Sequence, residues 1–384
     1  MANGPISQRE QLSGCRRIVI KVGTRLITDG ATGLNTGFLD SLARQMSQLR
    51  EQNHEFIIVT SGSIFLGRRI LALDRHEDTL PLRQAAAATG QPALMRHWSE
   101  ALRHRGLICA QILLTQDDVS DRRRYLNVRN TIEALLRRRV IPIINENDSV
   151  STEGITFDEN DKLAALVAST IQADLAIYLS DQQGLFTANP LVDPDAKLVS
   201  QVRPEEDYSA CAEGAGGPES KGGMSAKLVA ATTLADCGIP VVMAHGRTEH
   251  VVTRLIAGEN LGTFFVPRPP LQARKLWIAT AATPVGHLVV DDGARRALLR
   301  PDGASLLPIG ITEIRGRFLA GDLVRILGPE GTEVARGLSN YASDEVERIR
   351  GAHTSQIADL LGHVAHHEVV HRDNMVLAEQ LNGR

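Results

Sequence analysis

Aromatic residues and cysteines are scarce in this chain. Phe, Trp and Tyr together make up 4% of the 384 residues, so few side chains could stack on nucleic-acid bases. The formal net charge of -3 also does not favour a protein whose main partner is nucleic acid. The cysteines are Cys15, Cys109, Cys211 and Cys237. Their spacing fits neither a metal site nor a redox motif and is typical of buried thiols in a reducing cytosol.

Long apolar runs are missing as well. No run approaches the ~20 residues of a membrane span, and the N-terminal Met-Ala-Asn-Gly-Pro lacks the charged-then-apolar pattern of a signal peptide. We therefore expect a soluble cytoplasmic protein with no membrane partner. Hydrophobic residues nevertheless make up 43% of the chain, which is enough for a sizeable core. At ~150 residues per domain, the length predicts two or three domains.

Strand-like and helix-like segments alternate through the first two thirds of the chain. The strand-like runs cover residues 16–24, 107–115, 140–144, 175–181 and 239–244, and another starts at Phe56. The helix-like segments cover residues 38–52, 83–103, 121–139, 162–171, 224–237 and 249–256. We expect the long helix 83–103 to be interrupted near Gly90-Gln-Pro92. The alternation predicts an α/β domain with a mainly parallel sheet.

A second domain is predicted after Pro267-Arg-Pro-Pro270, which is typical of a linker. Short strand-like runs at 286–290, 310–314 and 322–326 are separated by glycine turns, which predicts a small β-rich domain. The predicted divisions are an α/β domain at 1–266, a linker at 267–275, a β-rich domain at 276–363 and a polar C-terminal tail at 364–384.

Two clusters of carboxylates and amides mark a candidate site. The apolar run that ends at Ile144 is followed directly by Asn145-Glu-Asn-Asp148, and Asp158-Glu-Asn-Asp161 opens the next helix-like segment. In open α/β sheets, ligands bind at the carboxyl ends of the strands. The sequence therefore predicts a ligand site at this edge.

Single residues elsewhere allow two interpretations each. Lys21, on an apolar strand next to Gly23, is either a phosphate-binding lysine or a strand-end lysine that reaches water, and neither is preferred. Ser61-Gly62 could bind an anion at a helix N-terminus, but an ordinary N-cap serine is favoured. The arginine-rich segment 121–139 is favoured as a solvated face over a nucleic-acid patch.

Taken together, these residues indicate phosphoryl transfer. The α/β domain supplies Lys21, Lys227, Asp148, Asp161 and Asp181, together with two glycine-bearing loops. Transfer of a phosphoryl group requires mainly positioning and neutralisation of negative charge. The sequence contains neither a Walker loop nor the signature set of protein kinases.

Five segments then resemble the glutamate 5-kinases of the amino-acid-kinase family. They are Ile20-Lys-Val-Gly23, Val59-Thr-Ser-Gly62, Asn145-Glu-Asn-Asp148, Glu159-Asn-Asp-Lys-Leu163 and Gly222-Gly-Met-Ser-Ala-Lys227. The β-rich domain resembles a PUA domain. The resemblance implies a three-layer α/β/α sandwich and ATP-dependent phosphorylation of the L-glutamate γ-carboxylate to L-glutamyl 5-phosphate, the first step of proline synthesis. A γ-carboxylate, with a reference pKa of about 4.3, is already an ionised nucleophile at neutral pH, so no general base is required.

The resemblance also implies roles for single residues. Lys21 and Lys227 would flank the transferring phosphoryl group, and Asp161 would hold the two lysines. The residues implied to bind glutamate are Ser61, Asp148 and Asn160. The residues implied to bind the nucleotide are Lys21, Ser180, Asp181, Lys221, Gly222, Gly223, Met224, Ser225, Ala226 and Lys227. Mg²⁺ would accompany ATP through its phosphates, without dedicated protein ligands. Further implied properties are feedback inhibition by proline and assembly into a dimer or tetramer.

The chain departs from the usual family pattern near the nucleotide and near Ser61. Gln183 replaces a lysine, Asn189 an aspartate, and Lys221 and Ala226 replace threonines. Glu159 replaces an aspartate, and Ser63-Ile-Phe-Leu66 replaces a smaller run. The first group bears on ATP affinity, and the second bears on proline inhibition.

Three alternatives stay open. One is a kinase of the same fold that acts on acetylglutamate, aspartate, carbamate or uridylate. Another is a non-catalytic regulator that binds a nucleotide or an amino acid and acts on RNA through the second domain, although RNA is not the favoured partner. The cluster of His363, His366, His367 and His371 could bind a metal, but a solvated tail is the favoured interpretation.

Overall fold

The computed structural model describes residues 6–29, 33–74, 76–115, 117–118, 122–151, 159–190, 192–213, 223–269, 275, 278, 284–300 and 303–381. The chain divides into two compact units, Met1–Pro270 and Leu271–Arg384. Each unit is built around its own sheet. Within the described residues, no helix is both long enough and apolar enough to cross a membrane.

The first unit contains an eight-stranded sheet in the order β5-β6-β4-β1-β7-β9-β10-β8. Its strands are β1 (Arg17–Val22), β4 (Glu55–Val59), β5 (Ile108–Leu114), β6 (Val140–Glu146), β7 (Leu175–Ser180), β8 (Gln201–Val202), β9 (Val241–His245) and β10 (Thr263–Phe265). The pairings from β5 to β9 are all parallel, and only β9 and β10 pair antiparallel. The predicted mainly parallel sheet is confirmed.

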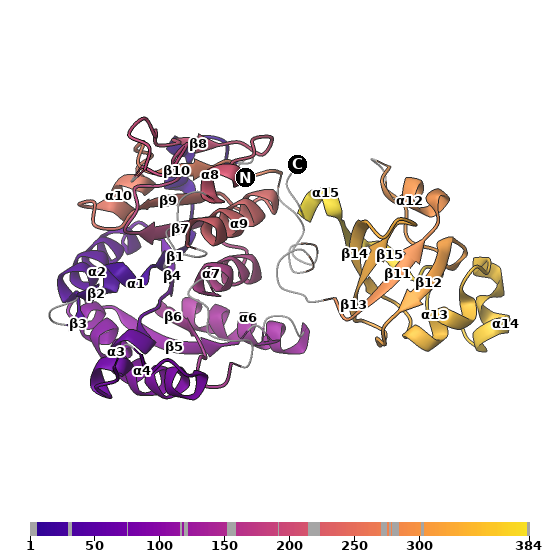
Figure 1. Cartoon of the computed structure of the whole chain (residues 1–384), viewed down its shortest axis with the longest axis horizontal. Helices are drawn as coiled ribbons and strands as arrows, with labels where there is room; N and C mark the ends of the chain where they lie inside the picture. Colours follow the sequence, from indigo (N-terminus) through magenta and orange to yellow (C-terminus); the bar gives the residue numbers. More distant parts are fainter. Residues whose placement is uncertain are drawn as a thin grey trace. The chain divides into compact units, whose positions relative to one another are not determined.

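Helices cover both faces of this sheet, as Figure 1 shows. One layer contains α2 (Thr36–Arg50), α3 (Ser63–Ile70), α4 (Leu80–Arg103) and α10 (Val251–Ile256). The other contains α6 (Arg122–Arg137), α7 (Glu159–Thr170) and α9 (Gly223–Asp236). The smaller elements are η1 (Arg9–Gly14), α1 (Thr24–Ile27), β2 (Thr28–Asp29), β3 (Gly33–Leu34) and α8 (Ser209–Glu213). The predicted three-layer α/β/α sandwich is therefore confirmed.

The helix α4 corrects one sequence prediction. We expected an interruption near Gly90 and Pro92, but α4 is continuous through Pro92. Proline removes one backbone donor, and packing of the buried face of α4 compensates for that loss. Gly90 packs directly against α3, because a Cβ built on it would overlap the backbone carbonyl of Ser63. Gly67 on α3 likewise leaves no room for a Cβ beside the carbonyl of Ala86. The two glycines thus allow α3 to approach α4 closely and fix the start of α3.

The second unit holds a mixed five-stranded sheet in the order β12-β11-β13-β14-β15. Its strands are β11 (Gly286–Val290), β12 (Ile311–Arg315), β13 (Leu323–Leu327), β14 (Glu333–Ser339) and β15 (Val370–Leu377). Its helices are α12 (Asp292–Leu298), η2 (Pro308–Gly310), α13 (Ser343–Ile349), η3 (Thr354–Gln356), α14 (Ile357–Leu361) and α15 (Ala378–Leu381). The prediction of a small β-rich domain is confirmed.

The prediction of a polar tail from residue 364 is wrong for β15, which pairs antiparallel with β14. The polar stretch from His371 to Asn374 hides this strand in the sequence, while Val370, Met375 and Val376 are buried in the core of the unit. Of the histidine cluster, His371 lies on β15, and the other three are exposed. Within the described residues, no group of three potential ligands could hold a metal. The other predicted domain borders stay predictions.

The close approach of α3 and α4 predicts a large cost for a single methyl group. Gly90→Ala should lower the free energy of unfolding by about 2 kcal/mol or more, because the backbone carbonyl of Ser63 cannot move without shifting α3. Gly37→Ala is the matched helical control, since its Cβ would meet only the Asn35 side chain at 3.7 Å. It should stabilise by up to ~1 kcal/mol. Urea unfolding followed by circular dichroism measures both, and equal effects would contradict the steric argument.

Candidate active site

The polar residues predicted as a site gather at one edge of the large sheet. β1, β4, β6 and β7 are parallel neighbours, so their carboxyl ends face the same side. At that edge, β1 leads into Gly23, β4 into Ser61, β6 into Asp148 and β7 into Asp181. Gly23 links the end of β1 to β7, because its backbone N–H donates to the carbonyl of Leu179 at 3.0 Å.

Strand alternation decides which way Lys21 points. Ile18, Ile20 and Val22 belong to the core cluster shared with α2, α4 and α10, and successive side chains of a strand face opposite sides. Lys21 therefore faces the layer of α6, α7 and α9. There its ammonium lies 2.6 Å from Oδ1 of Asp161, in the first turn of α7. Lys21 is only 6% exposed, so the interpretation as a lysine that reaches water is wrong.

Asp161 contacts both predicted catalytic lysines. Its Oδ2 lies 3.9 Å from Nζ of Lys227, one turn into α9, and Lys227 also donates to the carbonyl of Gly223 at 2.6 Å. Asp161 itself is 1% exposed. Lys21 and Asp161 are buried and Lys227 is half-buried, and burying charges is costly unless they are paired. One carboxylate between two ammonium groups leaves these three side chains with a net positive charge, which suits a phosphate ligand.

Tyr178 positions Asp161, and sequence reasoning missed it. Its buried hydroxyl donates to the backbone carbonyl of Asp161 at 3.1 Å. Burial, together with the charge of Asp161, raises the pKa of Tyr178 well above its usual value, so the hydroxyl stays a donor at neutral pH. Tyr178 lies opposite Lys21 in the register of β7 and β1. A tyrosine inside an apolar strand gives no sequence signal for such a role.

Ser61 is not the N-cap of α3. The N-cap position is Gly62, whose φ of 106° lies in the left-handed region and which makes no side-chain cap. The favoured interpretation of Ser61 as an ordinary N-cap serine is therefore wrong. The Ser61 hydroxyl instead donates to the carbonyl of Val22 at 3.1 Å and accepts from the Thr24 hydroxyl at 2.9 Å. These bonds tie the end of β4 to the end of β1 beside Lys21.

A buried polar cluster surrounds Asp148. The Ser63 hydroxyl donates to Oδ2 of Asp148 at 3.4 Å, and the Asn145 amide donates to Ser63 Oγ at 3.3 Å and to Gln91 Oε1 at 2.9 Å. Asn145 was part of a predicted motif but not of the predicted site residues, and Gln91 was missed because it sits within a long helix. Asn145 Oδ1, Gln91 Nε2 and Asn160 Oδ1 are buried without a hydrogen-bond partner among the described residues. Such atoms are costly unless a ligand or water satisfies them.

The residues expected to bind the nucleotide lie at the carboxyl end of β7 and at the start of α9. Ser180 is the last residue of β7, and its hydroxyl accepts from the backbone N–H of Gln182 at 3.2 Å. Asp181 pairs with Arg25 at 2.9 Å. Burial raises the pKa of Asp181, but the hydrogen bond and charge of Arg25 and the nearby Lys227 outweigh it and hold that pKa below its usual value. Gly223, Met224, Ser225, Ala226 and Lys227 begin α9. Lys221 and Gly222 lie outside the described residues.

Comparisons with known proteins match this geometry to a family. The amino acid kinase family matches residues 16–245, which span every residue of the site just described. The chain belongs to the amino acid kinase family. The PUA domain matches residues 286–361, within the second unit. The predicted resemblance to this family and to the PUA domain is confirmed.

Relatives of this amino acid kinase cover nearly its whole length. A glutamate 5-kinase from Trichlorobacter lovleyi is 45% identical over 372 residues, which cover 96% of this chain and 99% of that protein. A glutamate 5-kinase from an Azoarcus species is also 45% identical, over 96% of this chain and 100% of its own. Among solved structures, carbamate kinase from Giardia lamblia bound to AMP-PNP matches with a TM-score of 0.48 and 14% identity, over 67% of this chain and 100% of that chain.

Because Lys21 and Asp161 form a buried ion pair, we expect substitutions of the two residues to have non-additive effects on stability. Asp161→Asn should lower the free energy of unfolding by about 3 kcal/mol, because it leaves the buried Lys21 ammonium without a counter-charge. Adding Lys21→Met should recover a large part of that loss, since the unpaired charge is then gone. A double-mutant cycle by urea unfolding measures the coupling. Simple addition of the two losses would show that the pair does not interact.

Proposed function

We propose that the chain transfers the γ-phosphoryl group of ATP to the γ-carboxylate of L-glutamate, the first step of proline synthesis. The products are L-glutamyl 5-phosphate and ADP. The observation that carries this proposal is the contact of the buried Lys21 and Asp161 with the half-buried Lys227 at the carboxyl edge of the sheet. Full-length relatives named glutamate 5-kinase support the choice of acceptor.

The reaction balances with the groups at hand. A carboxylate oxygen of glutamate forms a bond to the γ-phosphorus, the bond from that phosphorus to the β,γ-bridging oxygen breaks, and ADP leaves with the electron pair. The glutamate carboxylate is ionised at neutral pH, so no proton has to be removed. Lys21 and Lys227 lower the repulsion between two anions and neutralise charge on the phosphoryl oxygens. Asp161 keeps the two ammonium groups in place.

The amide cluster supports an amino acid as acceptor. An α-ammonium group donates three hydrogen bonds and therefore needs oxygen acceptors. Buried acceptors without a partner among the described residues are Asn145 Oδ1 and Asn160 Oδ1, and the Asp148 carboxylate lies in the same cluster as Asn145. We assign glutamate binding to Ser61, Asp148 and Asn160, with Asn145 added. An acceptor without an ammonium group, such as carbamate or uridylate, would leave these oxygens unsatisfied.

Nucleotide binding is assigned to the opposite part of the edge. We propose that Ser180, Asp181 and the segment from Lys221 to Lys227 bind ATP, together with Lys21. Mg²⁺ fits a site on the nucleotide phosphates: both oxygens of Asp161 already face lysines, and the described residues contain no group of three metal ligands. When bound, Mg²⁺ supplies charge neutralisation on those phosphates. A cytoplasmic location, inhibition by proline and assembly into a dimer or tetramer stay predictions.

The activity test uses the purified chain with MgATP and hydroxylamine, which traps an acyl phosphate as a hydroxamate. We expect ADP release and hydroxamate formation with L-glutamate, and far less with aspartate or acetylglutamate. Lys227→Ala should lower kcat by about 100-fold or more, because it removes a charge that stabilises the transition state. The exposed Lys197→Ala is the matched control and should leave kcat unchanged. Turnover with another acceptor only, or with none, would refute the proposal.

The assignment of Asn145 predicts a selective loss of glutamate affinity. Asn145→Ala should raise KM for glutamate by about 10-fold or more, since a lost hydrogen bond to a charged group costs roughly 1.5–3 kcal/mol. KM for ATP should change little. Asn147→Ala is the control, because the Asn147 side chain bonds only to the exposed Ser149 hydroxyl among the described contacts. An equal rise in both KM values would mean that Asn145 supports the whole edge and does not contact glutamate.

A further inference from the structure

A cavity of about 590 Å³ lies at the edge of the large sheet opposite the candidate active site. Residues at the starts of three strands line it: Arg16 precedes β1, Glu55 and Phe56 begin β4, and Val140 and Ile141 begin β6. At the other edge, Lys21 lies near the end of β1, Ser61 follows β4, and Asn145 lies near the end of β6. This volume is within the usual range for small-molecule sites, ~300–1,000 Å³. The proposed kinase reaction does not use this cavity.

Cations dominate the cavity. Its lining includes four arginines, Arg16, Arg50, Arg137 and Arg139, and one carboxylate, Glu55. Glu55 is already shared by Arg16 at 2.7 Å and by Arg17 at 3.2 Å. No carboxylate of the described residues pairs with Arg50, Arg137 or Arg139. In a protein whose net charge is -3, this local excess of positive charge stands out.

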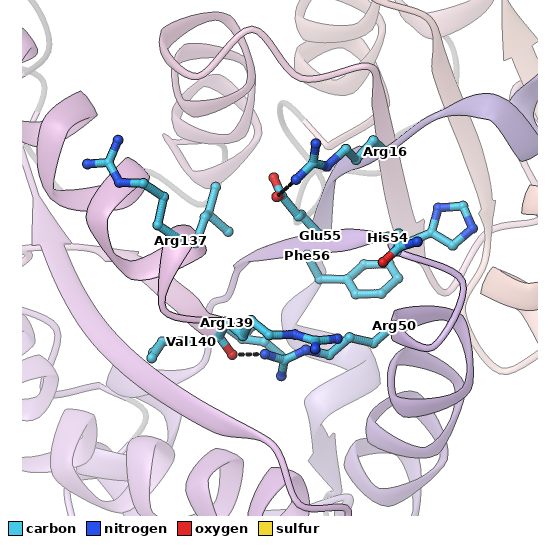
Figure 2. A pocket seen from close by; sticks show the side chains of 11 residues that line it. Arg16, Arg50, His54, Glu55, Phe56, Arg137, Arg139 and Val140 are labelled. Carbon is cyan, nitrogen blue, oxygen red and sulfur yellow. Dashed lines mark hydrogen bonds and ion pairs between the residues drawn. The ribbon is translucent and has the colours of Figure 1, made fainter.

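Two of these arginines lie close together, as Figure 2 shows. Arg50 donates a hydrogen bond to the backbone carbonyl of Arg139. Burial lowers the pKa of Arg50, and the charge of Arg139 lowers it further. Arg139 has a φ of 59°, an uncommon backbone conformation for a side chain of this size. An anion between the two guanidinium groups would relieve their repulsion.

The floor of the cavity is apolar, since Phe56, Leu136 and Ile141 line it and are buried. His54 also lines it, but its ring points away from the arginines (Figure 2), and its Nδ1 lies 2.7 Å from the carbonyl of Cys15. The recognising groups are therefore the guanidinium groups. Their planar, forked donors match phosphate oxygens well.

We propose that this cavity is a second ligand site, distinct from the active site, which binds a small phosphate-bearing anion. Arg50 and Arg139 hold the phosphate, and Arg137 and Arg16 add charge at the rim. Two of the four arginines have a structural explanation. Arg50 and Arg137 lie in the last turns of α2 and α6, where the helix dipole stabilises a cation. That explanation does not account for Arg139, which lies outside the helices, whereas Arg16 is held in place by its ion pair with Glu55.

The probe is inorganic pyrophosphate, titrated by calorimetry at an ionic strength of about 0.1 M, where charges are screened beyond ~10 Å. All titrations use the full chain with Lys227→Ala, so that the active site contributes less. Arg137→Gln with Arg139→Asn should weaken pyrophosphate binding at least tenfold. Asn tolerates the left-handed backbone at position 139. Arg138→Gln, a substitution at an exposed neighbour outside the lining, should change the affinity less than twofold.

The result separates this site from general surface charge. Equal weakening by Arg138→Gln, or no pyrophosphate binding in the Lys227→Ala chain, would overturn the proposal. Citrate is the second probe and carries carboxylates instead of phosphates. Citrate binding as tight as that of pyrophosphate would contradict the phosphate assignment. The test measures binding alone, so a failure of the proposed kinase activity would not affect it.

Discussion

The buried carboxylate of Asp161 is the contact on which the rest of the active edge depends. It joins Lys21 on the central strand β1 to Lys227 on α9, and it belongs to α7, which lies between them. Without it, two like charges would face each other in a place with little water. The Tyr178 hydroxyl holds the backbone of Asp161 by donating to its carbonyl. The proposed chemistry and the packing of one helical layer thus depend on the same side chain.

The two edges of the sheet treat charge in opposite ways. At the carboxyl edge, Asp161 balances the lysines in part, and amides and hydroxyls fill the neighbouring space. At the other edge, arginines outnumber carboxylates, and the only carboxylate of the lining is engaged by two of them. β1, β4 and β6 span the distance between these edges as rigid parallel strands. Residues at the two ends of each strand are therefore held at fixed separation.

Much of this architecture could be read from the sequence, because strand and helix periodicities differ and alternate along the chain. The side of the sheet that Lys21 faces follows from the alternation in β1. Its partner Asp161 is 140 positions away, so the sequence could not decide between a phosphate-binding lysine and a lysine that reaches water. Ser61 was misjudged because the left-handed backbone of Gly62 moves the start of α3. Local propensity gave the wrong prediction at Gly90 and Pro92 in α4 and at the polar residues of β15, because tertiary packing decides the structure there. Gln91 and Tyr178 acquire their roles only through contacts across the fold.

The order of strands has a consequence for the growing chain. β1 pairs with β4, which is made soon afterwards, but its other neighbour is β7, where Ile18 meets Leu175. Throughout synthesis of the intervening residues, one side of β1 exposes unpaired backbone groups in an apolar strand. Such an edge invites pairing with other chains. The ribosome must therefore deliver more than 150 residues before the centre of the sheet is closed and Lys21 meets its counter-ion.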